Sequence, residues 1–190
     1  NNLIATAIDI VSGVGIKGNL FDSGDRDFYK INMSSAGLLT LDFDAPTNSS
    51  ADYFNVSLKD ANGHALTSFT TGKDQSMTAG VAAPGNYYIE VARGDYSNDE
   101  TYYIRPKFFN VKMGSSSLLY ETEVNNSSGT ADSLALGSSI RGQIGGRSDV
   151  DYYKIVVDGR GTLNLDFDAP TNSSADYFNV RLISNSYQTF

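Results

Sequence analysis

The chain has 190 residues, a formal net charge of -8 at pH 7 and a sequence pI of about 4.5. This acidic balance argues against nucleic acid or an anionic membrane surface as a partner, because both require clustered Lys and Arg, and it is compatible with cationic ligands. The absence of cysteine excludes disulfides, thiolate catalysis and thiolate zinc sites. No apolar run approaches the roughly 18 residues of a membrane-spanning helix, so we expect no membrane insertion.

From the N-terminus, residues 1–12 show no helical stripe and predict an irregular lead-in with one short helical turn. Apolar residues then alternate with polar or small ones, the pattern of half-buried strands. Eight such segments follow at regular spacing, with turn residues between them, at 15–20, 28–33, 37–43, 53–58, 65–69, 76–81, 87–91 and 101–109. Without intervening helices, this succession predicts an all-β fold, an antiparallel β-sandwich of jelly-roll-like type.

The sequence then begins again. Residues 41–56 and 165–180 both read LDFDAPTNSSADYFNV, and the same offset of 124 residues pairs Asn1 with Asn125 and Leu66 with Phe190 without a gap. Solenoid repeats are about 20 to 50 residues long, so this period is that of a whole domain. We predict a tandem repeat, with one domain at residues 1–119 and a truncated second copy at residues 120–190.

The second copy predicts strands at residues 139–144, 152–157, 161–167 and 177–182, and it lacks counterparts of residues 67–124. Half a sandwich leaves an apolar face uncovered and strand edges unpaired. We therefore expect either that the natural protein continues beyond Phe190 or that another chain completes the copy through a homotypic contact. We favour the first.

The order of these segments resembles the bacterial pre-peptidase C-terminal domain family, which includes the collagen-binding domains of collagenases. In the second copy the resemblance is carried by Glu121-Thr-Glu123-Val-Asn125-Asn126, Ile140-x-Gly142-x-Ile144, Asp149-Val-Asp151-Tyr152-Tyr153-Lys154-Ile155 and Gly161-x-Leu163-x-Leu165. In the first copy it is carried by Ile16-x-Gly18-x-Leu20, Asp25-x-Asp27-Phe28-Tyr29-Lys30-Ile31, Gly85-Asn-Tyr87-Tyr88-Ile89-Glu-Val91 and Tyr102-Tyr-Ile104. The resemblance implies a non-catalytic β-sandwich of secreted proteases or surface proteins.

The resemblance also implies calcium where the acidic lead-in crosses the Asp-x-Asp-Tyr turn. Calcium takes about six to eight oxygen ligands. The candidate ligands of the second copy are Glu121, Glu123, Asn125, Asn126, Asp149 and Asp151. Asn126 stands where the family commonly has an acid, and Asp-x-Asp stands where the collagenase modules look more like Asp-x-x-Asp. In the first copy only Asn1, Asp25 and Asp27 correspond, so we expect that site to be weaker or empty.

A second acidic group, Asp42, Asp44 and Asp52, lies in the duplicated stretch. Paired carboxylates can serve a glycosidase or a further metal site. Asp42 and Asp44 alternate with Leu41 and Phe43, however, so we interpret them as the solvent-facing side of a strand.

The sequence gives no support for catalysis. His64 is the only histidine, it follows an Asn-Gly turn, and its counterpart in the second copy is Gln188. A catalytic triad or a histidine metal site would therefore depend on a single turn residue. The sequence also contains no nucleophile elbow, phosphate loop or HExxH motif. We predict that the chain is not an enzyme.

We expect a calcium-stabilised binding or adhesion module of a secreted or cell-surface bacterial protein. Its partner would be an extracellular peptide, protein or polysaccharide. The alternative is a structural spacer in a long surface array, with no ligand beyond the metal. An exposed aromatic patch or groove would favour the binding module, because tyrosine supplies rigid contact area.

Overall fold

The computed structural model describes residues 1–81, 83–109, 119–144, 149–169 and 177–184. The chain forms two compact units, Asn1–Val156 and Val157–Phe190. Within the described ranges the secondary structure is β, apart from one 3-10 turn, η1 (Ile4–Thr6). No helix in these ranges is long and apolar enough to cross a bilayer.

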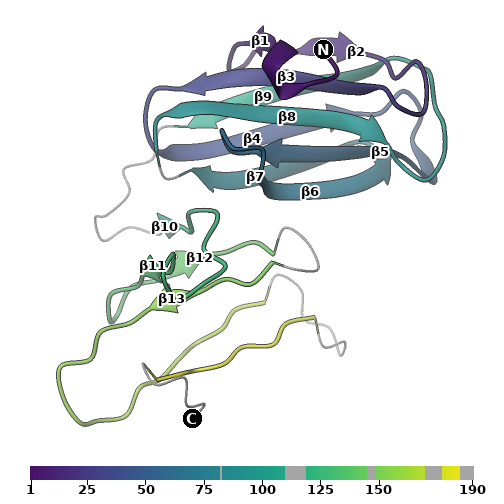
Figure 1. Ribbon diagram of the computed structural model, residues 1–190. Helices are drawn as coiled ribbons and strands as arrows, with labels where there is room; N and C mark the ends of the chain where they lie inside the picture. The colour runs from purple at the N-terminus through teal and green to yellow at the C-terminus, as the bar shows by residue number, and fades with distance from the viewer. Residues whose placement is uncertain (82, 110–118, 145–148, 170–176, 185–190) are drawn as a thin grey trace. The chain divides into compact units, whose positions relative to one another are not determined.

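Two sheets form a β-sandwich in the first unit (Figure 1). The five-stranded sheet has the order β1 (Ile8–Ile10), β3 (Arg26–Met33), β8 (Gly85–Arg93), β5 (Ser49–Lys59) and β6 (Ala65–Gly72). The four-stranded sheet has the order β2 (Ile16–Gly18), β9 (Tyr102–Phe109), β4 (Gly37–Asp44) and β7 (Gln75–Val81). The predicted all-β sandwich is therefore confirmed, and each of the eight predicted strands has a counterpart.

The core of the sandwich lies between the sheets and follows from the period-two pattern. In β4, Leu39, Leu41 and Phe43 are buried while the residues between them face outward. The ring of Phe43 packs on Phe54 of β5, with 5.2 Å between centroids, and stacks on Tyr102 of β9 at 5.7 Å. Aromatic side chains from both sheets thus hold the layers together.

The outward position of Asp42 confirms the solvent-facing interpretation of this strand. Its carboxylate pairs with the ammonium group of Lys107 at 2.7 Å and accepts a hydrogen bond from Ser76 Oγ at 2.9 Å. Both partners lie on the neighbouring strands β9 and β7. The carboxylate therefore supports the strand pairing of the outer face.

Two features of the first copy differ from the prediction. The lead-in contains the strand β1, which pairs in parallel with β3, Ile8 opposite Tyr29, so the five-stranded sheet is not purely antiparallel. Three residues are too few to show a period, and the pairing is supported by an ion pair of 2.8 Å between Asp9 and Lys30. Strand β5 begins at Ser49 rather than at residue 53, because an irregularity of pairing with β6 accommodates the polar residues after Ser49.

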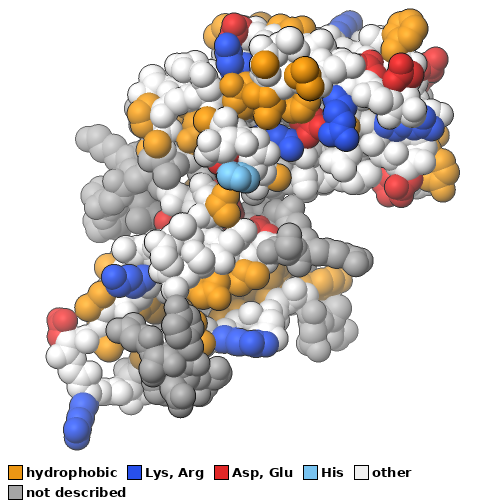
Figure 2. All heavy atoms as spheres, viewed as in Figure 1, with side chains coloured by type: hydrophobic (Ala, Val, Ile, Leu, Met, Phe, Trp, Pro, Cys, Tyr) orange, Lys and Arg blue, Asp and Glu red, His pale blue; other side chains and the backbone are white. Residues whose placement is uncertain are grey.

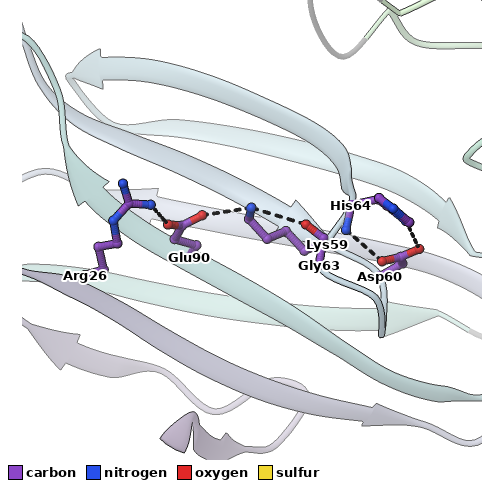
Figure 3. Close-up of polar contacts among 6 residues, drawn as sticks. All are labelled: Arg26, Lys59, Asp60, Gly63, His64 and Glu90. Carbon is purple, nitrogen blue, oxygen red and sulfur yellow. Dashed lines mark hydrogen bonds and ion pairs between the residues drawn. The ribbon is translucent and has the colours of Figure 1, made fainter. Parts of the chain in front are cut away.

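A row of polar contacts crosses the five-stranded sheet and the β5–β6 turn (Figure 3). Glu90 of β8 is 6% exposed, and its carboxylate pairs with Arg26 Nη1 at 2.5 Å and Lys59 Nζ at 3.0 Å. At the turn, His64 Nδ1 lies 3.1 Å from Asp60 Oδ2, and its backbone N–H donates to Asp60 Oδ1 at 2.8 Å. The single histidine is thus a turn residue bonded to a turn carboxylate.

The opening of the second copy also belongs to the first unit. It forms two short parallel pairs, β10 (Leu119–Tyr120) with β12 (Ile140–Arg141) and β11 (Asp132–Ser133) with β13 (Tyr153–Lys154). The pairing of Asp132 with Tyr153 stands 124 residues after that of Ile8 with Tyr29. The strands predicted at residues 139–144 and 152–157 are shorter than expected, two residues each.

In the second unit, the described residues 157–169 and 177–184 contain no strand of two or more residues, so the predicted strands at 161–167 and 177–182 are wrong for this structure. Their counterparts β4 and β5 are each paired on both sides, with β7, β9, β6 and β8. The residues matching those four partners are almost entirely absent from the sequence, so the hydrogen-bonding neighbours of the predicted strands are missing.

The aromatic pair of the duplicated stretch is nevertheless present in both copies. Phe167 and Phe178 lie 5.3 Å apart at 59°, and their counterparts Phe43 and Phe54 lie 5.2 Å apart at 57°. The exposure differs greatly, since Phe167 is 55% exposed and Phe43 is 2% exposed. The same pair is a core contact in one copy and a surface contact in the other.

This difference gives a test within one chain. We expect Phe43→Ala to lower the free energy of unfolding of the sandwich by about 3 to 5 kcal/mol, because a buried ring is lost and a cavity remains. The matched Phe167→Ala should cost less than about 1 kcal/mol, as surface substitutions do. Denaturant unfolding followed by tyrosine fluorescence measures both, and equal costs would contradict the assigned core.

Candidate metal centre

Three acidic side chains meet at the opening of the second copy. Glu121, Glu123 and Asp151 each place one carboxylate oxygen so that these oxygens all lie within 4.8 Å of one another. Glu121 directly follows β10, and its backbone N–H donates to Arg141 O at 2.8 Å. Asp151 lies two residues before Tyr153, the first residue of β13. The lead-in thus lies against the Asp-x-Asp-Tyr turn.

Glu121 is the most enclosed member of the cluster, at 3% exposed. Its carboxylate accepts hydrogen bonds from Tyr153 Oη, from the backbone N–H of Gln143 and from Asn125 Nδ2 at 3.2 Å. A Cβ atom at Gly142 would lie 2.3 Å from Tyr153 Oη and 2.7 Å from Glu121 Oε2. Glycine at this position therefore makes room for the carboxylate and its phenol partner.

Two buried oxygens at this place, Asn125 Oδ1 and Asp151 Oδ1, have no hydrogen-bond partner among the residues that the structure describes. Asn125 is 0% exposed, and its Nδ2 already donates to Glu121. A buried polar atom without a partner costs about 1 to 3 kcal/mol, so such atoms are rare in folded proteins. Oxygen atoms of carboxylates and amides are the ligands that Ca²⁺ and Mg²⁺ prefer, and the residues therefore fit a hard divalent cation.

The electrostatics of the cluster agree with its geometry. Burial, followed by the charges of Asp149 and Glu121, raises the pKa of Glu123 from 4.5 to about 8. Burial, followed by the charges of Glu121 and Asp149, raises the pKa of Asp151 from 3.8 to about 7. Both carboxyl groups therefore retain protons near neutral pH unless a cation compensates their charge.

The other predicted ligands of this copy have different positions. Asp149 acts on Glu123 and Asp151 through its charge. Asn126 is exposed, and its Oδ1 accepts a hydrogen bond from the backbone N–H of Val150 at 3.2 Å, so this oxygen is used to shape the turn.

Sequence reasoning missed three residues of the cluster. Asp132 accepts hydrogen bonds from the backbone N–H and the hydroxyl of Thr122, at 2.7 and 2.6 Å, and fixes the lead-in. Gln143 and Tyr153 donate to Glu121. Comparison of the copies gives no signal for Asp132, because its counterpart Ile8 is apolar. Tyr153 has a signal, since the first copy also has a tyrosine, Tyr29, at the matching position. The hydroxyl of Tyr29 likewise lies in a buried polar network.

The first copy fills the matching place with phenols. The hydroxyl of Tyr102 donates to the carboxylate of Asp27 and lies 2.8 Å from the hydroxyl of Tyr29. Burial raises the pKa of Asp27, and burial raises that of Tyr29 to about 12. Asp25 accepts a hydrogen bond from the backbone N–H of Phe21 at 2.8 Å. In the part of the chain that the structure describes, no third acidic side chain gathers with Asp25 and Asp27.

The raised pKa values predict a pH dependence of stability without metal. The folded state binds more protons than the unfolded state between the ordinary pKa values near 4 and the folded values of about 7 and 8. The stabilisation is therefore complete below about pH 4 and is lost as the pH rises to about 8. In chelator, we expect the melting temperature to fall from pH 5 to pH 8.

The double variant with Glu123→Gln and Asp151→Asn is the control for this experiment. Its melting temperature should change less over the same pH range, because the two titrating groups are absent. A wild-type melting temperature that rises from pH 5 to pH 8 in chelator would contradict the assignment.

No protein-family model matches the chain. Among solved structures, the chain is similar to the pre-peptidase C-terminal domain of a collagenase from Bacillus anthracis, with 24% identity over 53% of this chain and 94% of that one and a TM-score of 0.44. It is also similar to a carbohydrate-binding module in complex with calcium and xylotriose, with 14% identity over 50% of this chain and 88% of that one and a TM-score of 0.29. A pre-peptidase C-terminal domain is thus among the solved structures to which the chain is similar.

Proposed function

We propose that the chain is a non-catalytic binding or adhesion module of a secreted or cell-surface bacterial protein, built as a tandem repeat and stabilised by calcium at the opening of its second copy. The observation that supports this most directly is the gathering of three carboxylate oxygens within 4.8 Å beside two buried oxygens without partners. The resemblance to the pre-peptidase C-terminal family gives the same expectation. The repeat boundaries at residues 1–119 and 120–190 belong to this proposal.

Calcium would be held by the carboxylates of Glu121, Glu123 and Asp151 and by the amide oxygen of Asn125. The set contains only oxygen donors, which suits a hard cation and not zinc. Asp149 adds negative charge beside the set. The cation would supply positive charge that stabilises the ionised carboxylates, so its role is structural. Asp25 and Asp27 form the weaker candidate site of the first copy.

Calcium bound here would fix the lead-in of the second copy to its Asp-x-Asp-Tyr turn. Glu121 and Glu123 lie in the lead-in, whereas Asp151 precedes β13. A ligand that binds only the folded arrangement stabilises that arrangement. We therefore infer that calcium makes the lead-in of the second copy rigid.

The surface composition supports an extracellular peptide, protein or polysaccharide as partner rather than nucleic acid. On the face drawn in Figure 2, basic and acidic side chains are interspersed among polar and hydrophobic ones. The net charge of -8 also disfavours phosphate contacts.

Calcium-loaded protein should bind insoluble protein fibres or insoluble polysaccharide in a sedimentation assay. Binding to neither would favour the alternative function, a structural spacer in a surface array.

The second unit supports a homotypic contact as a further part of the proposal. Its described residues expose large apolar side chains, among them Leu165, Phe167 and Tyr177. Exposed apolar surface of this kind favours association. Light scattering over a range of protein concentrations tests this point, and a constant monomer mass would exclude it.

The calcium site is tested by calorimetric titration after chelator treatment. We expect saturable binding by the wild-type chain and a raised melting temperature. Glu123→Gln and Asp151→Asn should each weaken binding by about tenfold or more, since even outer-shell partners of a metal contribute about 10- to 100-fold.

Asp44→Asn is the matched control, because Asp44 is exposed at the end of β4 and should leave calcium binding unchanged. Absence of saturable binding by the wild-type chain would reject the calcium site and leave the metal-free spacer.

A further inference from the structure

The lead-in that carries the acidic cluster lies against the edge of the four-stranded sheet. Strand β7 is the last strand in the order of this sheet. Val81 of β7 forms a parallel bridge with Glu123, and the backbone N–H of Glu123 donates to Gly80 O at 3.2 Å. Glu123 of the segment 121–123 therefore joins the edge of β7 through a single bridge, in the manner by which extended segments begin to add to a sheet edge.

Gly80 is the residue that permits this approach. A Cβ atom at Gly80 would lie 1.8 Å from the carbonyl oxygen of Glu121 and 3.0 Å from its carbonyl carbon. Real Cβ atoms do not come so close to other atoms, and a backbone carbonyl cannot rotate away as a flexible side chain can. A side chain at this position would therefore force the backbone of the lead-in or of β7 to shift.

A second contact joins the opening of the second copy to the sandwich of the first copy. Gln143 Nε2 donates to Thr67 Oγ1 of β6 at 3.1 Å, and Thr67 is 4% exposed. The backbone N–H of the same Gln143 donates to the carboxylate of Glu121. Gln143 thus connects an acidic residue of the cluster with the first sandwich.

We propose that the β7 edge is part of the cation site, with Gly80 as its positioning residue. Gly80 supplies no ligand; it sets the backbone of Glu121 and Glu123, from which two of the three gathered carboxylates project. Because the same three-residue segment docks on β7 and carries these carboxylates, cation binding and docking are coupled, and by linkage each favours the other. This inference rests on the proposed calcium site and adds the β7 edge of the same chain to it.

The experiment is a calcium titration of Gly80→Ala, Thr67→Val and Ser76→Ala beside the wild-type chain. Gly80→Ala should weaken calcium binding by about tenfold or more, as loss of an outer-shell support does. Thr67→Val removes the acceptor of Gln143 with little change of shape and should weaken binding less. Ser76 also lies on β7, but its hydroxyl donates to Asp42 of β4. Ser76→Ala should therefore leave calcium binding unchanged.

Hydrogen exchange at the Glu123 amide, which donates to Gly80 O, is the second measurement. Calcium should slow this exchange in the wild-type chain and have a smaller effect in Gly80→Ala. Near-ultraviolet circular dichroism shows whether the sandwich of each variant is folded. If Gly80→Ala does not fold, Thr67→Val decides the question, because its affinity must then fall below that of Ser76→Ala.

The outcomes separate the two proposals. A wild-type chain that binds no calcium overturns the proposed calcium site and the coupling with it. A wild-type chain that binds calcium while a folded Gly80→Ala variant binds it equally well overturns the coupling alone.

Discussion

Buried oxygen atoms that lack hydrogen bonds are the constraint on which the opening of the second copy depends. Glu121 satisfies its carboxylate with a phenol, a backbone amide and a side-chain amide. One oxygen each of Asn125 and Asp151 remains without a partner in the described part of the chain. The mutual repulsion of the carboxylates adds to this cost. Protons or a cation at the centre would reduce this repulsion, so the charge that the site favours follows from its packing.

The two copies share a backbone hydrogen bond but surround it with different side chains. Phe28 N–H donates to Asn1 O at 3.0 Å, and 124 residues later Tyr152 N–H donates to Asn125 O at 3.1 Å. Beside this shared hydrogen bond, the first copy places the Tyr102 hydroxyl on Asp27, whereas the second copy places Glu121 on the hydroxyl of Tyr153. A phenol brings its own proton, but a second carboxylate does not. The duplicated backbone is therefore compatible with a network of phenols around one carboxylate in the first copy and with a cation site in the second.

The sequence predicts the sandwich well because its strands are long enough to show their period. In β4 the alternation of buried and partly exposed residues is regular, whereas β1 has only three residues and its parallel pairing depends on β3. The stretch LDFDAPTNSSADYFNV shows the limit of local reasoning. In the first copy it is largely strand, and in the second copy its described residues are not, because strands need neighbours to pair with. Of the candidate site, Glu121, Glu123 and Asp151 are predictable as acids in matching motifs. Asp132 and the contact with Gly80 depend on the way the chain returns in space.

The duplicated aromatic pair has a consequence for the order of folding. Phe167 and Phe178 adopt the ring geometry of Phe43 and Phe54 although the described residues around them form no strand. Only ten residues separate the members of each pair, so the entropy lost in closing the loop between them is small. Contacts of Phe43 with Tyr102 span most of the first copy and form at a greater entropic cost. We infer that the local pair forms early and that β9 joins later, an order that folding kinetics of Phe54 and Tyr102 variants would reveal.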